Sequence, residues 1–249
     1  MDAATYLRSH RCHDVQFLLK RWHVVAKAAR LELRTVHISG GHPVIFIHTN
    51  TADQRLYFSA GIHGDEPAPV SALLEWAEEN LTLLRRLPVA IFPLLNPAGL
   101  SLNTRPDHRG IDLNRRFHDA GHPHIKAWWK CIGEMTFTAA FCLHEDYDAQ
   151  GIYCYEIYRQ PRMRIAESAL QASERVIPRD PRRRIDFRRA INGVIRRTRI
   201  PDLPGLPEPV ALFMHNTETA LTFETPSEFS LADRVRAHKA FLQSVTAGM

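Results

Sequence analysis

The fold is decided by residues 56–67, which read LYFSAGIHGDEP. Leu56–Ala60 is a short run of apolar and aromatic residues, which is typical of a buried strand. Gly61 and Gly64 permit tight or left-handed backbone angles, and Pro67 suits the first turn of a helix. The stretch therefore predicts a strand that enters a glycine-containing loop and then a helix, as in an α/β protein.

Other apolar runs repeat this pattern along the chain and predict further buried strands. They are Pro43–His48, Leu87–Leu95, Thr138–Leu143 and Ala220–Phe223. Helical stretches alternate with them, so we predict an α/β fold: a mixed, mostly parallel sheet flanked by helices on both faces. Residues 1–35 carry an apolar stripe that predicts a packing helix. A length of 249 residues suits one domain, and we expect residues 1–249 to form it.

His63 and Glu66 lie where the predicted strand meets its helix. In open α/β sheets, ligands gather outside the carboxyl ends of the strands. A loop with this spacing can direct an imidazole and a carboxylate at one metal ion. The alternative is structural: His63 caps the helix, and Glu66 complements the helix dipole.

The next strand leads into a polar segment that contains Arg105, Asn114 and Arg115. A guanidinium binds a carboxylate through two parallel hydrogen bonds, and a neighbouring amide adds a third donor. This combination suits a substrate with a free carboxylate. The alternative is a solvated loop held by surface ion pairs, which contribute little to stability.

His144 and Glu224 each follow a predicted strand. His144 is a candidate third metal ligand, and Glu224 is a candidate general base. Each also has a structural reading, His144 as a hydrogen-bonded core histidine and Glu224 as an ion-pair partner for an arginine.

In this order, the pieces resemble the zinc carboxypeptidase family, and the similarity is greatest to compact bacterial members of the murein peptide amidase type. Its most specific part is Asn96–Gly99, which reads NPAG, followed by an arginine and then by Asp112–Arg115, which reads DLNR. The matched positions are His63, Glu66, Arg105, Asn114, Arg115, His144 and Glu224. The succinylglutamate desuccinylase and aspartoacylase branch shares the same plan of metal site.

The resemblance implies one zinc ion per chain, held by His63, Glu66 and His144 with a fourth position open for water. Zinc lowers the pKa of such a water and polarises the scissile carbonyl. Glu145 and Asp146 follow His144 in the sequence and could orient that imidazole or remain solvated; we favour Asp146 as its support. Cobalt or manganese could replace zinc at such ligands.

The resemblance also implies the catalytic roles. Glu224 would take the proton of the water and pass it to the leaving amine, and Arg105 would stabilise the developing oxyanion. Asn114 and Arg115 would anchor the terminal carboxylate of a small peptide or an acylated amino acid. The expected activity is hydrolysis of an amide next to a free carboxylate. The alternatives are an N-acyl amino acid deacylase of the succinylglutamate desuccinylase and aspartoacylase type, and an inactive metal-binding scaffold with a basic face.

One departure from the family concerns the mobile tyrosine that many peptide-cleaving members carry upstream of the catalytic glutamate. No tyrosine occurs after Tyr158. Tyr147, Tyr153, Tyr155 and Tyr158 all follow the predicted third metal ligand closely, so one of them could reach the pocket from another direction. The departure favours a deacylase-like or otherwise unusual substrate.

The formal net charge of +5 is concentrated in residues 178–189 and in Arg196 and Arg197. We expect this basic run to border the cleft and to favour anionic substrates. Aromatic residues are not interleaved with it and no nucleic-acid motif accompanies it, so we expect no nucleic-acid partner. The amino terminus lacks a signal-peptide pattern and no run reaches membrane-spanning length, so we expect a cytoplasmic protein without a membrane partner. The sequence leaves the oligomeric state open.

Overall fold

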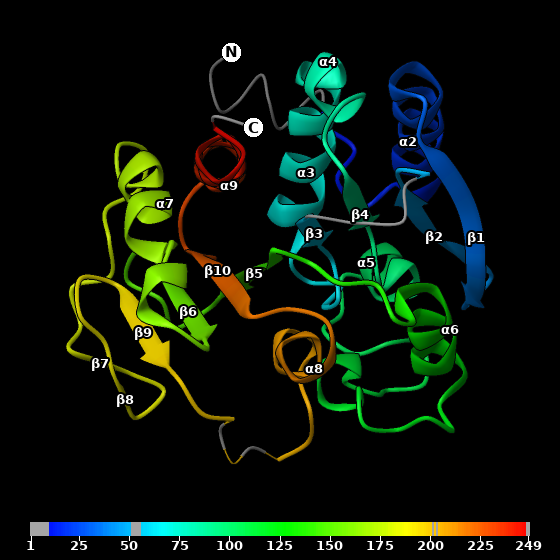
Figure 1. Cartoon of the computed structure of the whole chain (residues 1–249). Coiled ribbons are helices and arrows are strands. Elements are labelled where there is room, and N and C mark those ends of the chain that lie inside the picture. The colour runs from blue at the N-terminus through cyan, green and yellow to red at the C-terminus, as the bar shows by residue number, and fades with distance from the viewer. Residues whose placement is uncertain (1–9, 51–55, 201, 203, 248–249) are drawn as a thin grey trace.

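The computed structural model describes residues 10–50, 56–200, 202 and 204–247. Their main feature is an eight-stranded sheet in the order β1-β2-β4-β3-β5-β10-β6-β9 (Figure 1). The strands are β1 Glu32–Ser39, β2 His42–His48, β3 Leu56–Ser59, β4 Val89–Phe92, β5 Ala139–Asp146, β6 Tyr153–Tyr158, β9 Val194–Arg197 and β10 Thr219–Pro226. A separate hairpin joins β7 (Arg184–Ile185) to β8 (Arg188–Arg189).

The central strands β4, β3, β5 and β10 are parallel, so their carboxyl ends meet at one edge of the sheet. On one side, β2 pairs antiparallel with β4, and β1 pairs antiparallel with β2. On the other side, β6 is antiparallel to β10, and β9 is parallel to β6. Residues that leave the parallel strands are therefore delivered to a common place, which is where the candidate site lies.

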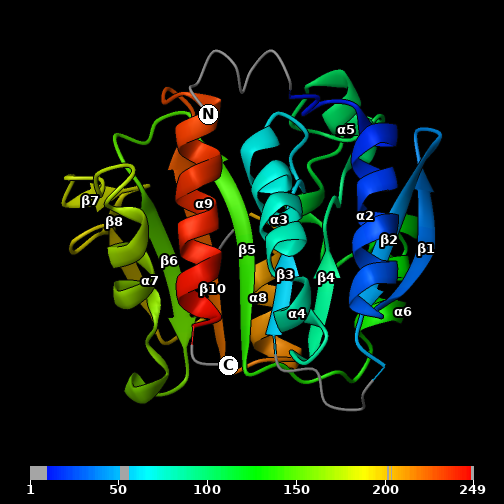
Figure 2. The same cartoon turned by 90° about the horizontal axis from the view of Figure 1, so that it is seen from above.

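Helices cover both faces of the sheet (Figure 2). One face carries α2 Val15–Ala29, α3 Pro67–Glu79, α7 Ala166–Ser173 and α9 Leu231–Val245. The other carries α6 Pro123–Ile132 and α8 Glu208–His215. The short elements are α4 Leu81–Leu84, α5 Pro97–Leu102, η1 Leu113–Arg115 and η2 Pro161–Met163. The predicted fold class is confirmed.

The central strands are apolar on both sides because each face has its own core. In β3, Phe58 packs with Phe141 and Trp76 on the side of α3 and α9. Its neighbour Tyr57 points the other way and packs with Trp128 of α6. Because successive side chains of β3 point to opposite faces of the sheet, this one strand packs against the helices on both faces.

The predicted helix over residues 1–35 is wrong for its last part, and residues 1–9 lie outside the described chain. Helix α2 begins after Asp14, whose side chain accepts a hydrogen bond from the N–H of Phe17. It ends at Arg30, which adopts a left-handed conformation (φ 60°). The following residues form β1 at the edge of the sheet rather than a continued helix.

Two predicted strand ends also differ from the structure. Strand β5 continues to Asp146 and β10 to Pro226, so His144 and Glu224 lie within strands rather than after them. The reason is that both strands keep their pairing through these positions. Strand β4 is shorter than the predicted Leu87–Leu95. Among the described residues, no helix combines the length and the apolar character needed to cross a membrane.

Candidate active site

His63, Glu66 and His144 form a buried group whose ligand atoms all lie within 4.8 Å of one another. Nδ1 of His63 lies 2.5 Å from one oxygen of Glu66, and Nδ1 of His144 lies 3.0 Å from the other. Glu66 occupies the N-cap position of α3, but its side chain makes no capping hydrogen bond. Glu66 is thus placed to complement the dipole of α3, but neither it nor His63 caps the helix through its side chain. Two imidazoles and a carboxylate instead present a set of atoms that can hold a metal ion.

The loop that carries His63 depends on two glycines. Gly61 has φ +64°, and a Cβ there would lie 2.7 Å from the side chains of Leu94 and Val70. Gly64 is needed for space, since its Cβ would lie 1.9 Å from the carbonyl carbon of Gly99. The loop is thus pressed against the turn that opens α5, and this contact holds His63 in place.

The electrostatics of the group favour a positive charge between its members. Burial alone would lower the pKa of His63, but the carboxylates of Glu66 and Asp112 raise it to about 9. Burial would likewise raise the pKa of Glu66, but His63 and His144 lower it to about 2. A cation fits this arrangement, because it can replace the protons on the imidazoles while keeping the buried carboxylate paired.

Asp112 supports His63 from the other side of its ring, a role that sequence reasoning missed. Its Oδ1 lies 3.4 Å from Nε2 of His63 and accepts a hydrogen bond from the N–H of Asn114. Its Oδ2 accepts a hydrogen bond of 3.3 Å from Nε of Arg105. Burial raises the pKa of Asp112, but His63 and the arginine together hold it well below its usual range. The available signal was its place two residues before Asn114.

Asp146 does not orient His144 as predicted. Its carboxylate accepts hydrogen bonds from the hydroxyl of Tyr153 and from the N–H of Asp148. The reason is that β5 remains extended, which separates positions 144 and 146 by about 6.6 Å along one face of the strand. Glu145 points to the opposite face and accepts a hydrogen bond of 2.6 Å from the N–H of Ala68 in α3.

Glu224 lies beside the metal-ligating group with a free carboxylate oxygen. The residue is 8% exposed, and its buried Oε2 has no hydrogen-bond partner among the described residues. Burial raises its pKa to about 8. A carboxylate kept in this condition is suited to accept and return a proton near neutral pH.

The remaining predicted residues also reach the same pocket. Arg105 places Nη1 3.7 Å from Glu66, and its side chain is 41% exposed. Oδ1 of Asn114 accepts a hydrogen bond from the N–H of Glu208, which leaves the amide NH₂ as its free donor group. Nη1 of Arg115 donates to the carbonyl of Asn114. The structure therefore brings together all seven residues that the sequence singled out.

Glu208 was not predicted, and its position in a proline-rich segment gave no signal. It is fully buried, and its carboxylate accepts hydrogen bonds from the hydroxyls of Tyr57 and Ser59 in β3. Burial raises its pKa. The backbone N–H of Glu208 also donates a hydrogen bond to the side chain of Asn114. Glu208 therefore links Asn114 and the start of α8 to β3, the strand that precedes His63.

The pocket in front of these residues has a volume of about 340 Å³. Tyr153 and Tyr155 of β6 line it, so two of the tyrosines that follow His144 do face the site. Arg188 and Arg197 line it as well, in agreement with the prediction that the basic run borders the cleft.

Comparison with known proteins agrees with this geometry. Residues 52–125 match the model of the succinylglutamate desuccinylase/aspartoacylase catalytic domain. Part of the chain is 29% identical to carboxypeptidase SOL1 of Arabidopsis thaliana, a match that covers 37% of this chain and 23% of SOL1. The chain thus spans about a quarter of that relative.

The described fold matches solved structures over nearly its whole length. A predicted metallopeptidase from Shewanella amazonensis superposes with a TM-score of 0.82 at 19% identity, covering 94% of this chain and 92% of that one. The chain has a zinc carboxypeptidase-like fold. A metallo-carboxypeptidase from Pseudomonas aeruginosa, solved with (2-guanidinoethylmercapto)succinic acid, superposes on this chain with a TM-score of 0.63 at 16% identity, covering 90% of this chain and 66% of that one.

Proposed function

We propose that this protein is a zinc-dependent hydrolase that cleaves an amide bond next to a free terminal carboxylate. The observation that carries the proposal is the buried group of His63, Glu66 and His144 beside the unpartnered carboxylate of Glu224. A metal-binding scaffold needs the first three residues alone. A buried carboxylate with an unused oxygen is costly unless it has a chemical task.

His63, Glu66 and His144 would hold one zinc ion, which acidifies a water molecule and polarises the scissile carbonyl when bound. Oε2 of Glu224 would accept a proton from that water and deliver it to the departing nitrogen. The burial that raises the pKa of Glu224 makes its protonated form accessible during the reaction.

Arg105 and the pair Asn114 and Arg115 would position the substrate. The half-exposed guanidinium of Arg105 lies beside Glu66 and can stabilise negative charge on the carbonyl oxygen. The amide NH₂ of Asn114 and the guanidinium of Arg115 line the pocket and can bind the terminal carboxylate. Anchoring this group would restrict cleavage to the end of a small peptide or to an acylated amino acid.

The deacylase reading is a second candidate, favoured by the match of residues 52–125 to the succinylglutamate desuccinylase/aspartoacylase model. Both activities release an amino acid with a free carboxylate, so they share the residues above. They differ in what lies on the other side of the scissile bond, which is a peptide in one case and a simple acyl group in the other.

The test is metal content together with hydrolysis of a panel of murein tripeptides, other peptides with free carboxyl ends, and N-acyl amino acids. We expect about one zinc per chain, as for a single catalytic site. Activity should disappear after dialysis against a chelator and return with zinc. The preferred members of the panel would separate peptidase from deacylase. A protein that binds no zinc on reconstitution would contradict the metal site, and a zinc-loaded protein that hydrolyses no member of the panel would favour the scaffold.

A further inference from the structure

Helix α3 follows directly on the loop that carries His63 and Glu66, and its first turn is short of backbone donors. Its first three residues are Pro67, Ala68 and Pro69. Proline has no N–H group, so Ala68 supplies the only backbone donor among these three positions. Such a donor is usually satisfied by the side chain of the N-cap residue. Glu66 holds that position without making a capping hydrogen bond, so the donor needs an acceptor from elsewhere in the chain.

The acceptor comes from β5. Glu145 follows His144 and, because side chains alternate along a strand, points to the opposite face of the sheet. Its Oε1 accepts a hydrogen bond of 2.6 Å from the N–H of Ala68, and its side chain is fully buried. One bond therefore joins the residue after His144 to the start of α3, two positions beyond Glu66.

This bond connects the two segments that hold the metal-ligating group. Glu66 and His144 are 78 positions apart in the sequence, yet Oε2 of the first lies 3.0 Å from Nδ1 of the second. The backbone between Glu66 and Ala68 has little freedom, because Pro67 fixes its own φ and restricts the residue before it. A shift of Ala68 away from β5 would therefore carry Glu66 away from His144.

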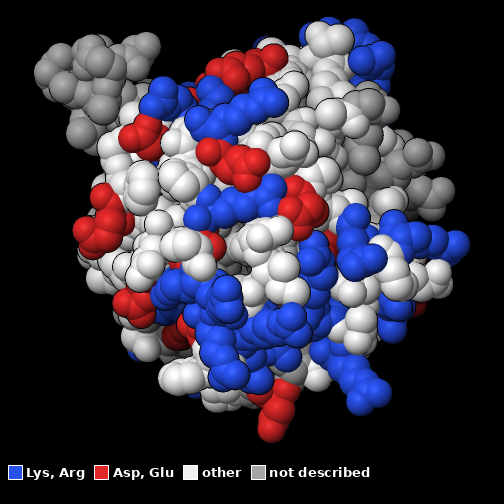
Figure 3. Space-filling view, turned by 90° about the vertical axis from the view of Figure 1, so that its left-hand side faces the viewer, with Lys and Arg blue, Asp and Glu red and all other residues white. Residues whose placement is uncertain are grey.

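Arg234 of α9 holds the other oxygen of Glu145. Its guanidinium forms an ion pair with Oε2, and its Nε donates a hydrogen bond of 2.9 Å to the carbonyl of Phe229. The side chain of Arg234 is only 13% exposed. It is thus separate from the basic surface, where Lys and Arg side chains gather on the face that carries α7 and the β7–β8 hairpin (Figure 3). The ion pair cancels the charge of Glu145 and fixes its carboxylate in one orientation.

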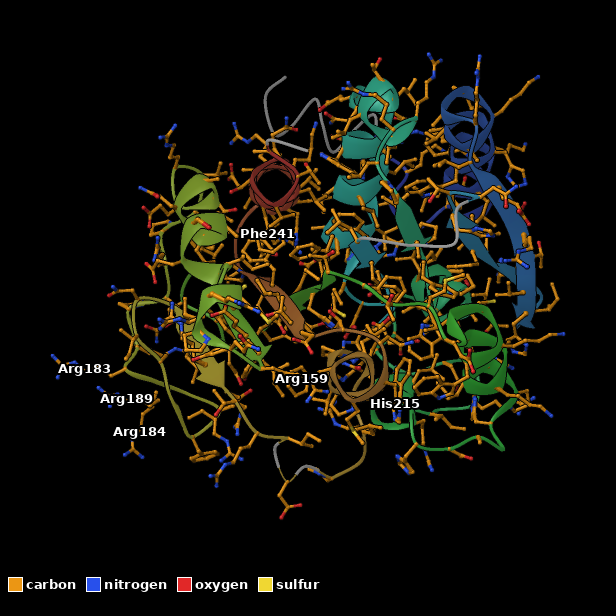
Figure 4. All side chains as sticks on the ribbon, in the orientation of Figure 1. Arg159, Arg183, Arg184, Arg189, His215 and Phe241 are labelled. Atoms are coloured by element: carbon orange, nitrogen blue, oxygen red, sulfur yellow. The ribbon has the colours of Figure 1, made fainter. Side chains whose placement is uncertain are left out.

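Attachment of α9 to the sheet is the competing explanation for this ion pair. Burial of two charges costs about as much as their attraction returns, and an apolar pair of similar size is often as stable. Apolar contacts already hold the helix: Phe241 lies between α9 and the sheet (Figure 4), and its ring stacks on that of Phe223 with the centroids 4.3 Å apart. The charges of Glu145 and Arg234 are therefore not needed to attach α9.

Building on the proposed function, we propose that Glu145 is a positioning residue of the metal site. Its hydrogen bond to Ala68 caps α3 in place of Glu66 and sets where Glu66 stands relative to His144. The carboxylate of Glu66 is thereby left for the metal. Arg234 supplies the counter-charge that allows a second carboxylate to be buried so close to the metal-ligating group.

Lys239 provides a matched control on the same helix. Its ammonium pairs with Glu75 and Glu79 of α3, so it also links α9 to α3 through an ion pair. Glu75 lies seven residues beyond Ala68, about 10 Å along the helix. Lys239→Met therefore weakens the contact between the two helices without releasing the start of α3 from β5.

The experiment measures zinc affinity, by competition with a coloured chelator, in two double variants of equal net charge. Glu145→Leu with Arg234→Met removes both the ion pair and the hydrogen bond to Ala68. Glu145→Gln with Arg234→Met removes the ion pair, but the amide oxygen can still accept the N–H of Ala68. We expect zinc affinity to fall about 10- to 100-fold in the first variant, the range for lost support behind metal ligands. The second variant and Lys239→Met should stay close to the parent.

Urea unfolding in chelator checks that the variants fold, and Glu145→Ala replaces Glu145→Leu if the leucine variant does not. Parental zinc affinity in the leucine variant would overturn the inference and leave the hydrolase intact. An equal loss in the glutamine variant or in Lys239→Met would also overturn it, because the bond to Ala68 would then not be what sets the affinity. A parent that holds zinc but hydrolyses no substrate would instead reject the proposed function, while the zinc affinities would still decide the role of Glu145.

Discussion

Glu224 and His144 occupy paired positions on the adjacent parallel strands β10 and β5. The pairing places the carboxylate of Glu224 next to one metal-ligand candidate, His144, without any contribution from a loop. At Glu224, strand β10 is paired on both sides, with His144 of β5 and with Tyr153 of β6, so this relationship is rigid. Rigid placement of this kind is what a proton acceptor at a reacting water requires.

Replacement of Glu224 by glutamine therefore separates catalysis from metal binding. The amide cannot accept the proton, and we expect kcat to fall by about 10²- to 10⁴-fold, the range for loss of a general base. Zinc content, measured by elemental analysis, should stay at the parental level. Full activity in Glu224→Gln would show that another group accepts the proton.

Replacement of His144 by alanine should abolish metal binding. The variant retains two of the three candidate ligands, fewer than the three protein ligands of a catalytic zinc site. In the parent, added zinc should raise the melting temperature because a ligand that binds only the folded state stabilises it. In His144→Ala this rise should be absent, whereas the exposed-residue control His118→Ala should show it in full. An undiminished rise in His144→Ala would contradict the assignment.

Much of the fold and part of this site follow from local sequence. Residues 56–67 predict the strand, the glycine loop and the start of α3 because apolar periodicity and backbone preference act over a few residues. The pairing of His144 with Glu224 joins segments about 80 residues apart, and no local pattern sets that register. The roles of Asp112 and Glu208 depend likewise on tertiary packing, which decides where a side chain points.

Asp112 is expected to strengthen the site through His63. Asp112→Asn keeps the size of the side chain but removes the charge that faces Nε2 of His63. Loss of such an outer partner lowers metal affinity by about 10- to 100-fold. Competition with a coloured chelator would measure the change, with the exposed Asp148→Asn as control. Equal zinc affinity in Asp112→Asn and the parent would show that Asp112 does not act through the histidine.

Gly64 is expected to tolerate no side chain, because its backbone lies against Gly99 and Leu100. A Cβ would lie 1.9 Å from the carbonyl carbon of Gly99 and 2.3 Å from the nitrogen of Leu100, so the backbone itself must move. We expect Gly64→Ala to lower the free energy of unfolding by about 1–3 kcal/mol, as overpacking does, and to weaken zinc binding by displacing His63. In Gly121→Ala, the added Cβ would meet nothing closer than 3.3 Å. This control should keep the parental free energy of unfolding, measured by urea titration, and the parental affinity for zinc.

His124 in α6 should make the folded state sensitive to acid. It is 3% exposed, its ring contacts that of His37, and its Nε2 finds no hydrogen-bond partner in the part of the chain that the structure describes. Burial, together with the nearby His37, His122 and His108, lowers its pKa to about 3. Between pH 6.5 and 3, the unfolded chain therefore binds a proton at this position that the folded chain does not.

This proton favours the unfolded state, so the contribution of His124 to stability is present above pH 6.5 and is lost progressively as the pH falls. Replacement by leucine removes the titrating group, and the variant should lose less stability than the parent between pH 7.5 and pH 5. Urea unfolding at both pH values, in chelator so that the metal ligands titrate alike in the two proteins, measures the difference. The exposed His118→Gln should follow the parent. If His124→Leu also follows the parent, the buried imidazole already accepts its proton in the folded protein, and its surroundings must supply an acceptor or rearrange to admit water.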